Sequence, residues 1–239
     1  MTRNFIMDRK TFILDLIIAL PFLSEPNFAT DRVLVNAGVG GNNSRDLLNR
    51  LDRDCLSHKP NLVILMVGTN DMNSAKHVPP NEFKQNVLTI IRRLKATGSN
   101  LLLLTTLPFF EPYLLQRHPK EFYEPEGPTG RWRSLNKMIK RIASETNSHL
   151  LDVGQIIEKI GKIGEDNDSL LQNEINSGKM DGVHPTPNGY RFIALAVSQY
   201  IQDNDLPTGR IVCFGDSITK GDGSVDKESY PAYLKKLLS

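Results

Sequence analysis

The 239-residue sequence has little cysteine, little net charge and no long apolar run, and each deficit excludes a class of protein. Its two cysteines, Cys55 and Cys213, fit no metal-binding or redox spacing, which predicts two reduced, partly buried thiols rather than a disulfide framework. The formal net charge is +2, and acidic and basic residues interleave along the chain. We therefore expect no nucleic acid or other polyanionic partner.

The most apolar stretch, residues 11–23, is too short to cross a bilayer, so no integral membrane span is expected. It follows a basic stretch and resembles a secretory signal, but Asp15 interrupts it, Pro21 breaks it and no small-residue cleavage pattern follows. We interpret residues 1–28 as an N-terminal helical segment of a cytoplasmic chain. Export directed by residues 1–23 is the alternative.

Apolar runs alternate with segments of helical periodicity along the chain. Strands are expected over 32–38, 61–68, 100–108, 149–153 and 209–216, and helices over 44–56, 79–98, 131–147, 186–202 and 229–239. This alternation predicts an α/β fold, a three-layer α/β/α sandwich around a five-stranded, mainly parallel sheet.

Neither a repeat nor a composition change marks a second domain, so residues 1–239 are expected to form a single domain. Residues 108–130 are rich in proline and aromatic side chains, and their length predicts a substantial surface loop. Residues 203–209 are typical of a short exposed linker to the last strand and helix, residues 210–239.

Polar or glycine-rich segments follow several of the predicted strands, where ligands bind in open α/β sheets. They are GVGGNNS after the first strand, GTND after the second and the serine of FGDSITKG after the fifth, and DGVHP precedes the helix at 186–202. A hydrolytic site needs a nucleophile, a base and hydrogen-bond donors for an oxyanion. These segments together contain one of each.

Taken singly, each of these residues has an ordinary structural interpretation. Ser217 is suited to a helix N-cap, and Gly41 to a tight turn. Asn70 is suited to bracing a loop, and the pair Asp181 and His184 to a packed turn. The pair is also a partial metal site, but no third ligand is evident, so neither a metal nor another cofactor is expected.

The four segments resemble the sequence blocks of the SGNH hydrolases, the GDSL-type esterases and lipases. The resemblance implies a flavodoxin-like SGNH hydrolase fold and hydrolysis of small carboxylic esters through an acyl-enzyme. It also implies that Ser217 is the nucleophile, His184 the general base and Asp181 the residue that orients the base. The implied oxyanion donors are the backbone N–H groups of Ser217 and Gly41 and the side-chain amide of Asn70.

The order of the blocks differs from that family, which begins with the serine block and ends with the Asp-x-x-His block. Here Ser217 follows His184, so the chain resembles a circular permutant with the serine strand and the next helix moved to residues 210–239. Thr219 stands where a G-x-S-x-G elbow has its final glycine, which argues against the α/β-hydrolase fold.

Two other functions compete with an esterase. NAGVGGNNS is close to a dinucleotide-binding fingerprint, but Asn43 replaces the third glycine and no acidic residue ends the next strand. A catalytically inactive ligand-binding module of the same fold is the second alternative. The acyl and alcohol specificity is not encoded in the shared blocks, and neither is the oligomeric state. Phe109, Phe110 and Tyr113 of the 108–130 stretch are candidates for the pocket wall.

Overall fold

A computed structural model describes residues 32–221 and 229–239; the predicted N-terminal segment 1–28 lies outside these residues. All five predicted strands form, and they make one sheet in which every neighbouring pair is parallel. The strands are β1 (Val33–Gly38), β2 (Leu62–Met66), β3 (Asn100–Leu104), β4 (His149–Leu151) and β5 (Arg210–Gly215). Their order across the sheet is β1-β5-β2-β3-β4.

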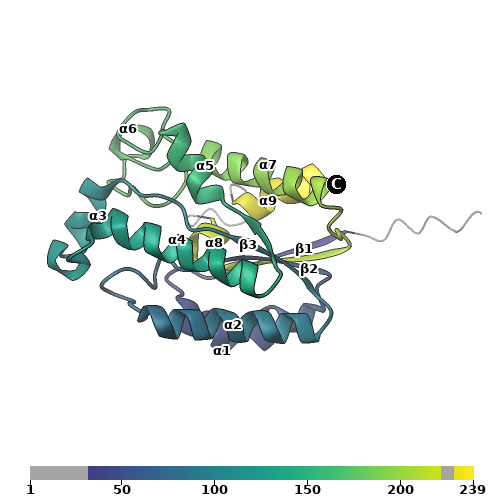
Figure 1. The fold of residues 1–239 in the computed structure, drawn as a ribbon. Coiled ribbons are helices and arrows are strands. Elements are labelled where there is room, and N and C mark those ends of the chain that lie inside the picture. Colours follow the sequence, from purple (N-terminus) through teal and green to yellow (C-terminus); the bar gives the residue numbers. More distant parts are fainter. Residues whose placement is uncertain (1–31, 222–228) are drawn as a thin grey trace, which may run out of the picture. The chain divides into compact units, whose positions relative to one another are not determined.

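Helices cover both faces of this sheet, which confirms the three-layer prediction (Figure 1). One face packs against α1 (Ser44–Asp54), α2 (Pro80–Ala96) and α4 (Gly127–Glu145). The other packs against α5 (Val153–Ile160), α7 (Pro187–Asp203) and α9 (Tyr230–Leu238). None of the helices within residues 32–221 and 229–239 has the length and apolar character needed to cross a membrane.

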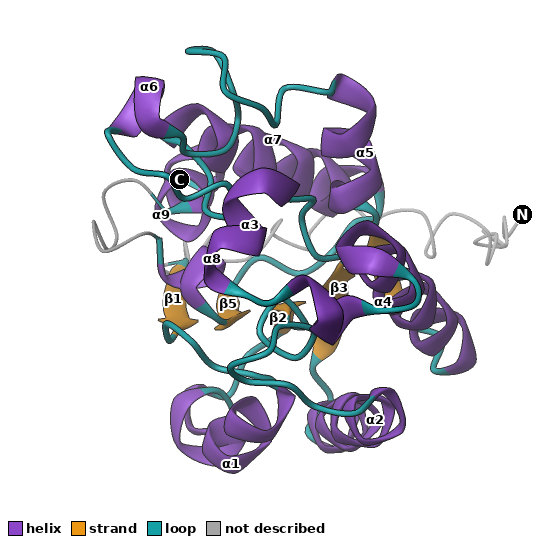
Figure 2. Ribbon diagram, turned by 90° about the vertical axis from the view of Figure 1, so that its left-hand side faces the viewer, coloured by secondary structure: helices purple, strands orange, loops and turns teal. Residues whose placement is uncertain are grey.

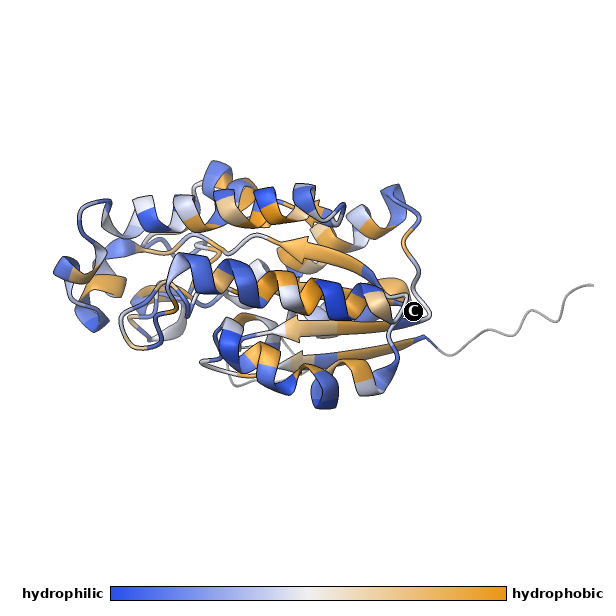
Figure 3. Ribbon diagram, turned by 60° about the horizontal axis from the view of Figure 1, so that its bottom comes forward, coloured by the Kyte–Doolittle hydropathy of each residue, from blue (hydrophilic) through white to orange (hydrophobic). Residues whose placement is uncertain are grey.

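The sheet is mostly apolar because both of its faces are covered (Figure 3). Every residue of β2 is buried, and so is every residue of β5 after Arg210. Alternate residues of a strand point to opposite faces, so one strand supplies both cores: Leu65 packs with α1 and α2, whereas Ile64 packs with α7. Both cysteines are buried and free, as expected.

The serine strand is an interior strand of the sheet. β5 pairs with β1 through Val33–Arg210 to Gly38–Gly215, and with β2 through Leu62–Ile211 to Met66–Gly215. The last strand of the chain therefore lies between the first two. Because the strands are parallel, β1, β5 and β2 end at the same edge of the sheet.

The prediction of a surface loop over 108–130 was wrong. This stretch contains helix α3 (Glu111–Arg117) and a 3₁₀ turn at Lys120–Tyr123, and α4 begins inside it at Gly127. Tyr113 and Tyr123 are almost fully buried, so the aromatic side chains help to form the core. Helix α6 (Glu174–Ser177) and helix α5 were also not predicted. Figure 2 looks at the end of the sheet where α3, α6 and α8 (Ser217–Lys220) gather.

Candidate active site

Ser217 lies at the carboxyl end of β5, as the first residue of helix α8. Asp216 caps this helix, and its Oδ1 accepts a 3.0 Å hydrogen bond from the backbone N–H of Ile218. Helix α8 packs very closely on β1: a Cβ atom on Gly38 would lie 2.1 Å from the backbone nitrogen of Lys220. A glycine at position 38 therefore allows the short helix that begins with Ser217 to lie against the sheet edge.

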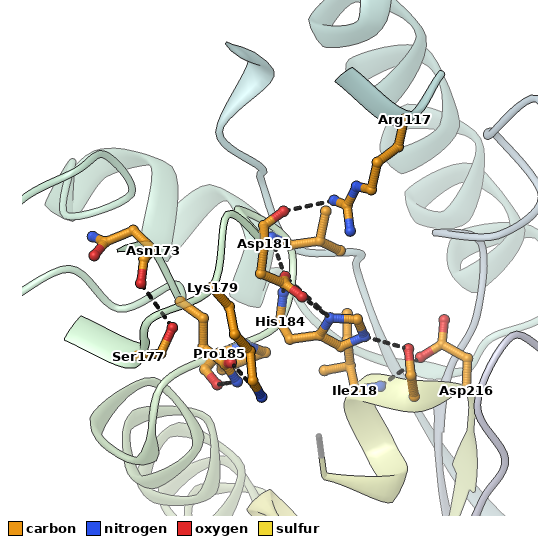
Figure 4. A network of polar contacts seen from close by, with 12 residues as sticks. Arg117, Asn173, Ser177, Lys179, Asp181, His184, Pro185, Asp216 and Ile218 are labelled. Atoms are coloured by element: carbon orange, nitrogen blue, oxygen red, sulfur yellow. Dashed lines mark hydrogen bonds and ion pairs between the residues drawn. The ribbon is translucent and has the colours of Figure 1, made fainter. Parts of the chain in front are cut away.

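Asp181 and His184 lie in the segment that leads into α7. The Asp181 carboxylate accepts hydrogen bonds from the backbone N–H groups of Val183 (2.9 Å) and His184 (2.7 Å), which closes the segment into a turn. The guanidinium of Arg117, at the end of α3, donates to the carbonyl oxygen of Asp181 from the other side (2.6 Å; Figure 4). These contacts fix the Asp181 carboxylate beside the His184 ring.

The structure brings Ser217, His184 and Asp181 together in one hydrogen-bonded line. Nε2 of His184 lies 2.8 Å from Oγ of Ser217, and Nδ1 lies 2.9 Å from Oδ2 of Asp181. The side chains of His184 and Asp181 are 21% and 13% exposed, so solvent reaches the imidazole only partly. A serine, an imidazole and a carboxylate in this arrangement can carry out nucleophilic acyl transfer.

The Asp181 carboxylate stays ionised at every pH at which a protein normally works. Burial alone would raise its pKa, but the hydrogen bond and charge of His184, together with the backbone N–H groups of His184 and Val183, outweigh burial and lower the pKa to about 2. A permanent negative charge on Asp181 holds the proton of the imidazole on Nδ1 and leaves Nε2 to face Ser217.

The predicted oxyanion donors Gly41 and Asn70 belong to two loops near Ser217. The loop after β1 contains Gly41 in a left-handed conformation (φ +75°), and a Cβ atom on its neighbour Gly40 would lie 4.0 Å from the Cβ of Ser217. Asn70 reaches this loop from the end of β2, because its Nδ2 donates to the carbonyl oxygen of Asn42 (2.9 Å). Within the described part of the chain, no acceptor takes the backbone N–H of Gly41 or Ser217.

Sequence reasoning missed Arg50, which ties this end of the sheet together. Its buried guanidinium donates to the carbonyl oxygens of Ala37 (2.9 Å) and Gly215 (2.7 Å) and to Oδ1 of Asn42 (2.6 Å). It also stacks on the Phe214 ring, 4.5 Å from the centroid. The signal that could have revealed Arg50 is its position between the apolar residues of an amphipathic helix, because a charge on a buried helix face needs partners.

Two further carboxyl groups, of Asp216 and Asp71, are buried beside the site. Burial raises the pKa of each to about 6, against the opposing effect of the hydrogen bonds that Asp216 accepts from Ile218 and Asp71 from Ser44. Nδ2 of Asn70 lies 3.4 Å from Oδ2 of Asp216, so the Asp216 carboxyl group is next to a candidate oxyanion donor. In residues 32–221 and 229–239, no three His, Cys, Asp or Glu side chains cluster closely enough to hold a metal ion.

A cavity of about 150 Å³ opens beside Ser217 and His184. Of the three aromatic residues predicted for its wall, Phe109 lines it. Phe110 and Tyr113 instead lie behind the Asp181–His184 segment, where a Cβ atom on Gly182 would lie 3.0 Å from the Phe110 Cβ and 3.2 Å from the Tyr113 Cβ. These two side chains support the segment that carries the histidine.

The sequence matches the model of the GDSL-like lipase/acylhydrolase family over residues 22–192. The chain belongs to this family. Its curated relatives include an acetylxylan esterase of Geobacillus stearothermophilus, 26% identical over 68% of this chain and 69% of that protein. An uncharacterized lipoprotein, YqeF, of Bacillus subtilis (strain 168) is 29% identical over 72% of this chain and 73% of its own length.

Solved structures of an acetyl xylan esterase and a lipase/acylhydrolase share the fold. An acetyl xylan esterase, AlAXEase, has a TM-score of 0.55 and 25% identity, covering 69% of this chain and 79% of its own. A lipase/acylhydrolase from Enterococcus faecalis has a TM-score of 0.56 at 21% identity, over 70% of this chain and 74% of that one. As a member of the GDSL-like family with acetylxylan esterase relatives, this chain is a hydrolase that acts on ester bonds.

Proposed function

We propose that the chain is a serine esterase that cleaves carboxylic esters through an acyl-enzyme intermediate. The observation that carries the proposal is the 2.8 Å contact between Nε2 of His184 and Oγ of Ser217, with Asp181 on the opposite ring nitrogen. Neither competing function requires this arrangement, since a nucleotide site or an inactive binding module does not need a base on the serine hydroxyl.

In the proposed mechanism, Ser217 Oγ attacks the ester carbonyl carbon while His184 Nε2 takes the hydroxyl proton. The carbonyl oxygen becomes an oxyanion, which the N–H groups of Ser217 and Gly41 and the Asn70 amide stabilise. Collapse breaks the bond to the alcohol oxygen, and His184 returns the proton to the leaving alcohol. Water, deprotonated by the same imidazole, then hydrolyses the acyl-enzyme and regenerates the serine hydroxyl.

We infer that the preferred substrates carry a short acyl group. The cavity of about 150 Å³ beside Ser217 holds a small group, and the acetylxylan esterase relatives support acetyl esters among the candidates. A panel of esters with varied acyl and alcohol parts identifies the substrate. The cytoplasmic assignment stays a prediction, which fractionation of cells that express a tagged chain would test.

A fluorophosphonate probe tests the proposed function directly, because it labels only an activated serine. Wild-type protein should be labelled and should hydrolyse p-nitrophenyl acetate, and Ser217→Ala should lose both properties. Ser57→Ala is the matched control, since Ser57 is exposed on the 3₁₀ turn after α1 and should keep both. Labelling or hydrolysis that persists in folded Ser217→Ala protein would refute the proposal.

We also propose that the chain is a circular permutant of its family. The block order supports this, as does the family match, which ends before Ser217. In addition, Arg32, just before β1, donates a hydrogen bond to the carbonyl oxygen of Leu238 at the end of α9. A short linker from 239 to 32, with the chain opened at 208, would restore the usual order, and this variant should fold and keep esterase activity. A reordered chain that folds but is inactive would contradict the proposal.

A further inference from the structure

The segment that joins β2 to α2 lines a second cavity as well as the one beside Ser217. The volume of the second cavity is about 190 Å³, slightly more than that of the cavity beside Ser217. Two backbone hydrogen bonds hold this segment. The N–H of Met72 donates to the carbonyl oxygen of Gly68 (3.1 Å), and the N–H of Val78 donates to the carbonyl oxygen of Asp71 (3.0 Å). The segment whose side chains line both cavities is thus held by its backbone.

Among the described residues that border either cavity, Met72 alone lines both. Its side chain is only 5% exposed and belongs to the core on the α1–α2 face of the sheet. Met72 also comes two positions after Asn70, a candidate oxyanion donor. A substrate group that extends from Ser217 towards this segment therefore meets the Met72 side chain before it can reach the second cavity.

The second cavity is suited to an apolar chain. Val78, Phe83, Leu135 and Met138 line it, and Phe83 and Val78 are almost fully buried. Its charged lining residues each have a partner: Arg131 pairs with Glu126 at 3.1 Å, and the Asp71 carboxyl group accepts a hydrogen bond from the backbone N–H of Ser44 (2.9 Å). Burying an apolar chain here would gain hydrophobic free energy with little loss of polar hydration.

We propose that Met72 is the specificity-determining residue that separates the two cavities and limits the length of the apolar chain of the ester substrate. This inference rests on the proposed esterase function and concerns the substrate class of the same site. With Met72 in place, the chain must fit the smaller cavity beside Ser217. A shorter side chain at position 72 joins the two cavities and admits a longer acyl or alkyl chain.

The test compares wild type with Met72→Ala and with Met72→Val in two series of esters. One series varies the acyl chain from acetyl to decanoyl on p-nitrophenol, and the other varies the alkyl alcohol of acetate esters. Wild-type kcat/KM should be highest for short chains in both series. In Met72→Ala, kcat/KM should rise by roughly fourfold for each added methylene that enters the second cavity. The rise should occur in the series, acyl or alkyl, whose varied chain contacts Met72. Met72→Val should give a smaller rise, and it decides the outcome if the alanine variant fails to fold.

Leu94→Ala is the matched control, because Leu94 is fully buried in the same core and borders neither cavity. It should lose stability and keep the wild-type chain-length profile. An unchanged profile for folded Met72 variants in both series would overturn the inference while leaving the esterase function intact. A wild-type preference for decanoyl or longer alkyl esters would also overturn it. Failure of wild type to hydrolyse any ester would instead refute the proposed function, and this inference with it.

Discussion

The guanidinium of Arg50 donates a 2.7 Å hydrogen bond to the carbonyl oxygen of Gly215, two residues before Ser217. The same guanidinium holds the carbonyl oxygen of Ala37 and the side chain of Asn42, so one side chain fixes the ends of β1 and β5 and the loop that contains Gly41. The distance between the candidate nucleophile and a candidate oxyanion donor thus depends on a residue that contacts no substrate.

Replacing Arg50 should therefore lower turnover more than substrate affinity. Arg50→Lys keeps the charge but loses the planar set of donors that reaches three acceptors at once. We expect kcat to fall by about 10- to 100-fold with KM nearly unchanged, because small misplacements of reacting groups cost about this much. Steady-state kinetics on p-nitrophenyl acetate checks this, with Arg53→Lys as the control, since Arg53 is an exposed arginine of the same helix. A change in KM alone would show that Arg50 does not position the catalytic groups.

Asp181→Asn should reduce kcat by about 10³- to 10⁴-fold, because an amide no longer holds the imidazole in the required tautomer. Steady-state kinetics checks this, with Asp168→Asn as the control, an exposed aspartate paired with Lys162.

The wild-type rate should rise with pH as His184 loses its proton, since only the neutral imidazole accepts the serine proton. Asp181 does not contribute to this rise, because its pKa of about 2 keeps it ionised over the whole range. The measurement is a pH–rate profile of the wild-type protein. A profile that is flat from pH 5 to 9, with chemistry rate-limiting, would contradict the role of His184.

Asp216 should make the protein less stable as the pH rises. Burial raises its pKa to about 6 in the folded protein, against the ordinary aspartate value of 3.8, so the folded state binds the proton more tightly than the unfolded state does. The free energy of unfolding should therefore fall between about pH 4 and pH 6, by at most roughly 3 kcal/mol from this group. Asp216→Asn keeps an oxygen for the Ile218 N–H and removes the titration, so urea unfolding should show a shallower fall. Some pH dependence should remain, because the pKa of Asp71 is also raised to about 6. An equally steep fall in the variant would refute the contribution of Asp216.

The sequence predicts the sheet because a strand that is buried on both faces has a continuous apolar sequence. In an alternating α/β pattern, an apolar run such as 61–68 is therefore typical of a buried parallel strand. The sequence is misleading at 108–130, where the prolines predict a loop. In the structure Pro112 and Pro128 lie in the first turns of α3 and α4, a position where proline is compatible with a helix. Ser217, His184 and Asp181 were predicted from motifs whose spacing is local. Arg50 was not, because its role depends on carbonyl groups of residues 37 and 215, which only the folded sheet brings to one side chain.

The position of β5 raises the question of whether it pairs within its own chain or is exchanged between two chains. The connection from α7 to β5 favours pairing within the chain. Leu206 is 7% exposed, and its N–H donates to the carbonyl oxygen of Ile201 (3.0 Å), so the chain folds back directly after the helix. The carbonyl oxygen of Gly209 then accepts a hydrogen bond from the N–H of Val33 (3.0 Å), at the start of β1. We therefore expect residues 210–239 to pair within their own chain.

Complementation between two inactive variants tests this arrangement. Ser217→Ala and His184→Ala proteins, unfolded together and refolded as a mixture, should remain inactive, because each folded chain would combine its own β5 with its own His184. If residues 210–239 were exchanged in dimers, half of the dimers would be mixed, and one of the two sites in each would contain both intact residues. Ester hydrolysis near a quarter of the wild-type rate would then appear, and this result would refute pairing within the chain. Wild-type protein carried through the same refolding, with circular dichroism on the mixture, ensures that a lack of activity reflects well-folded protein.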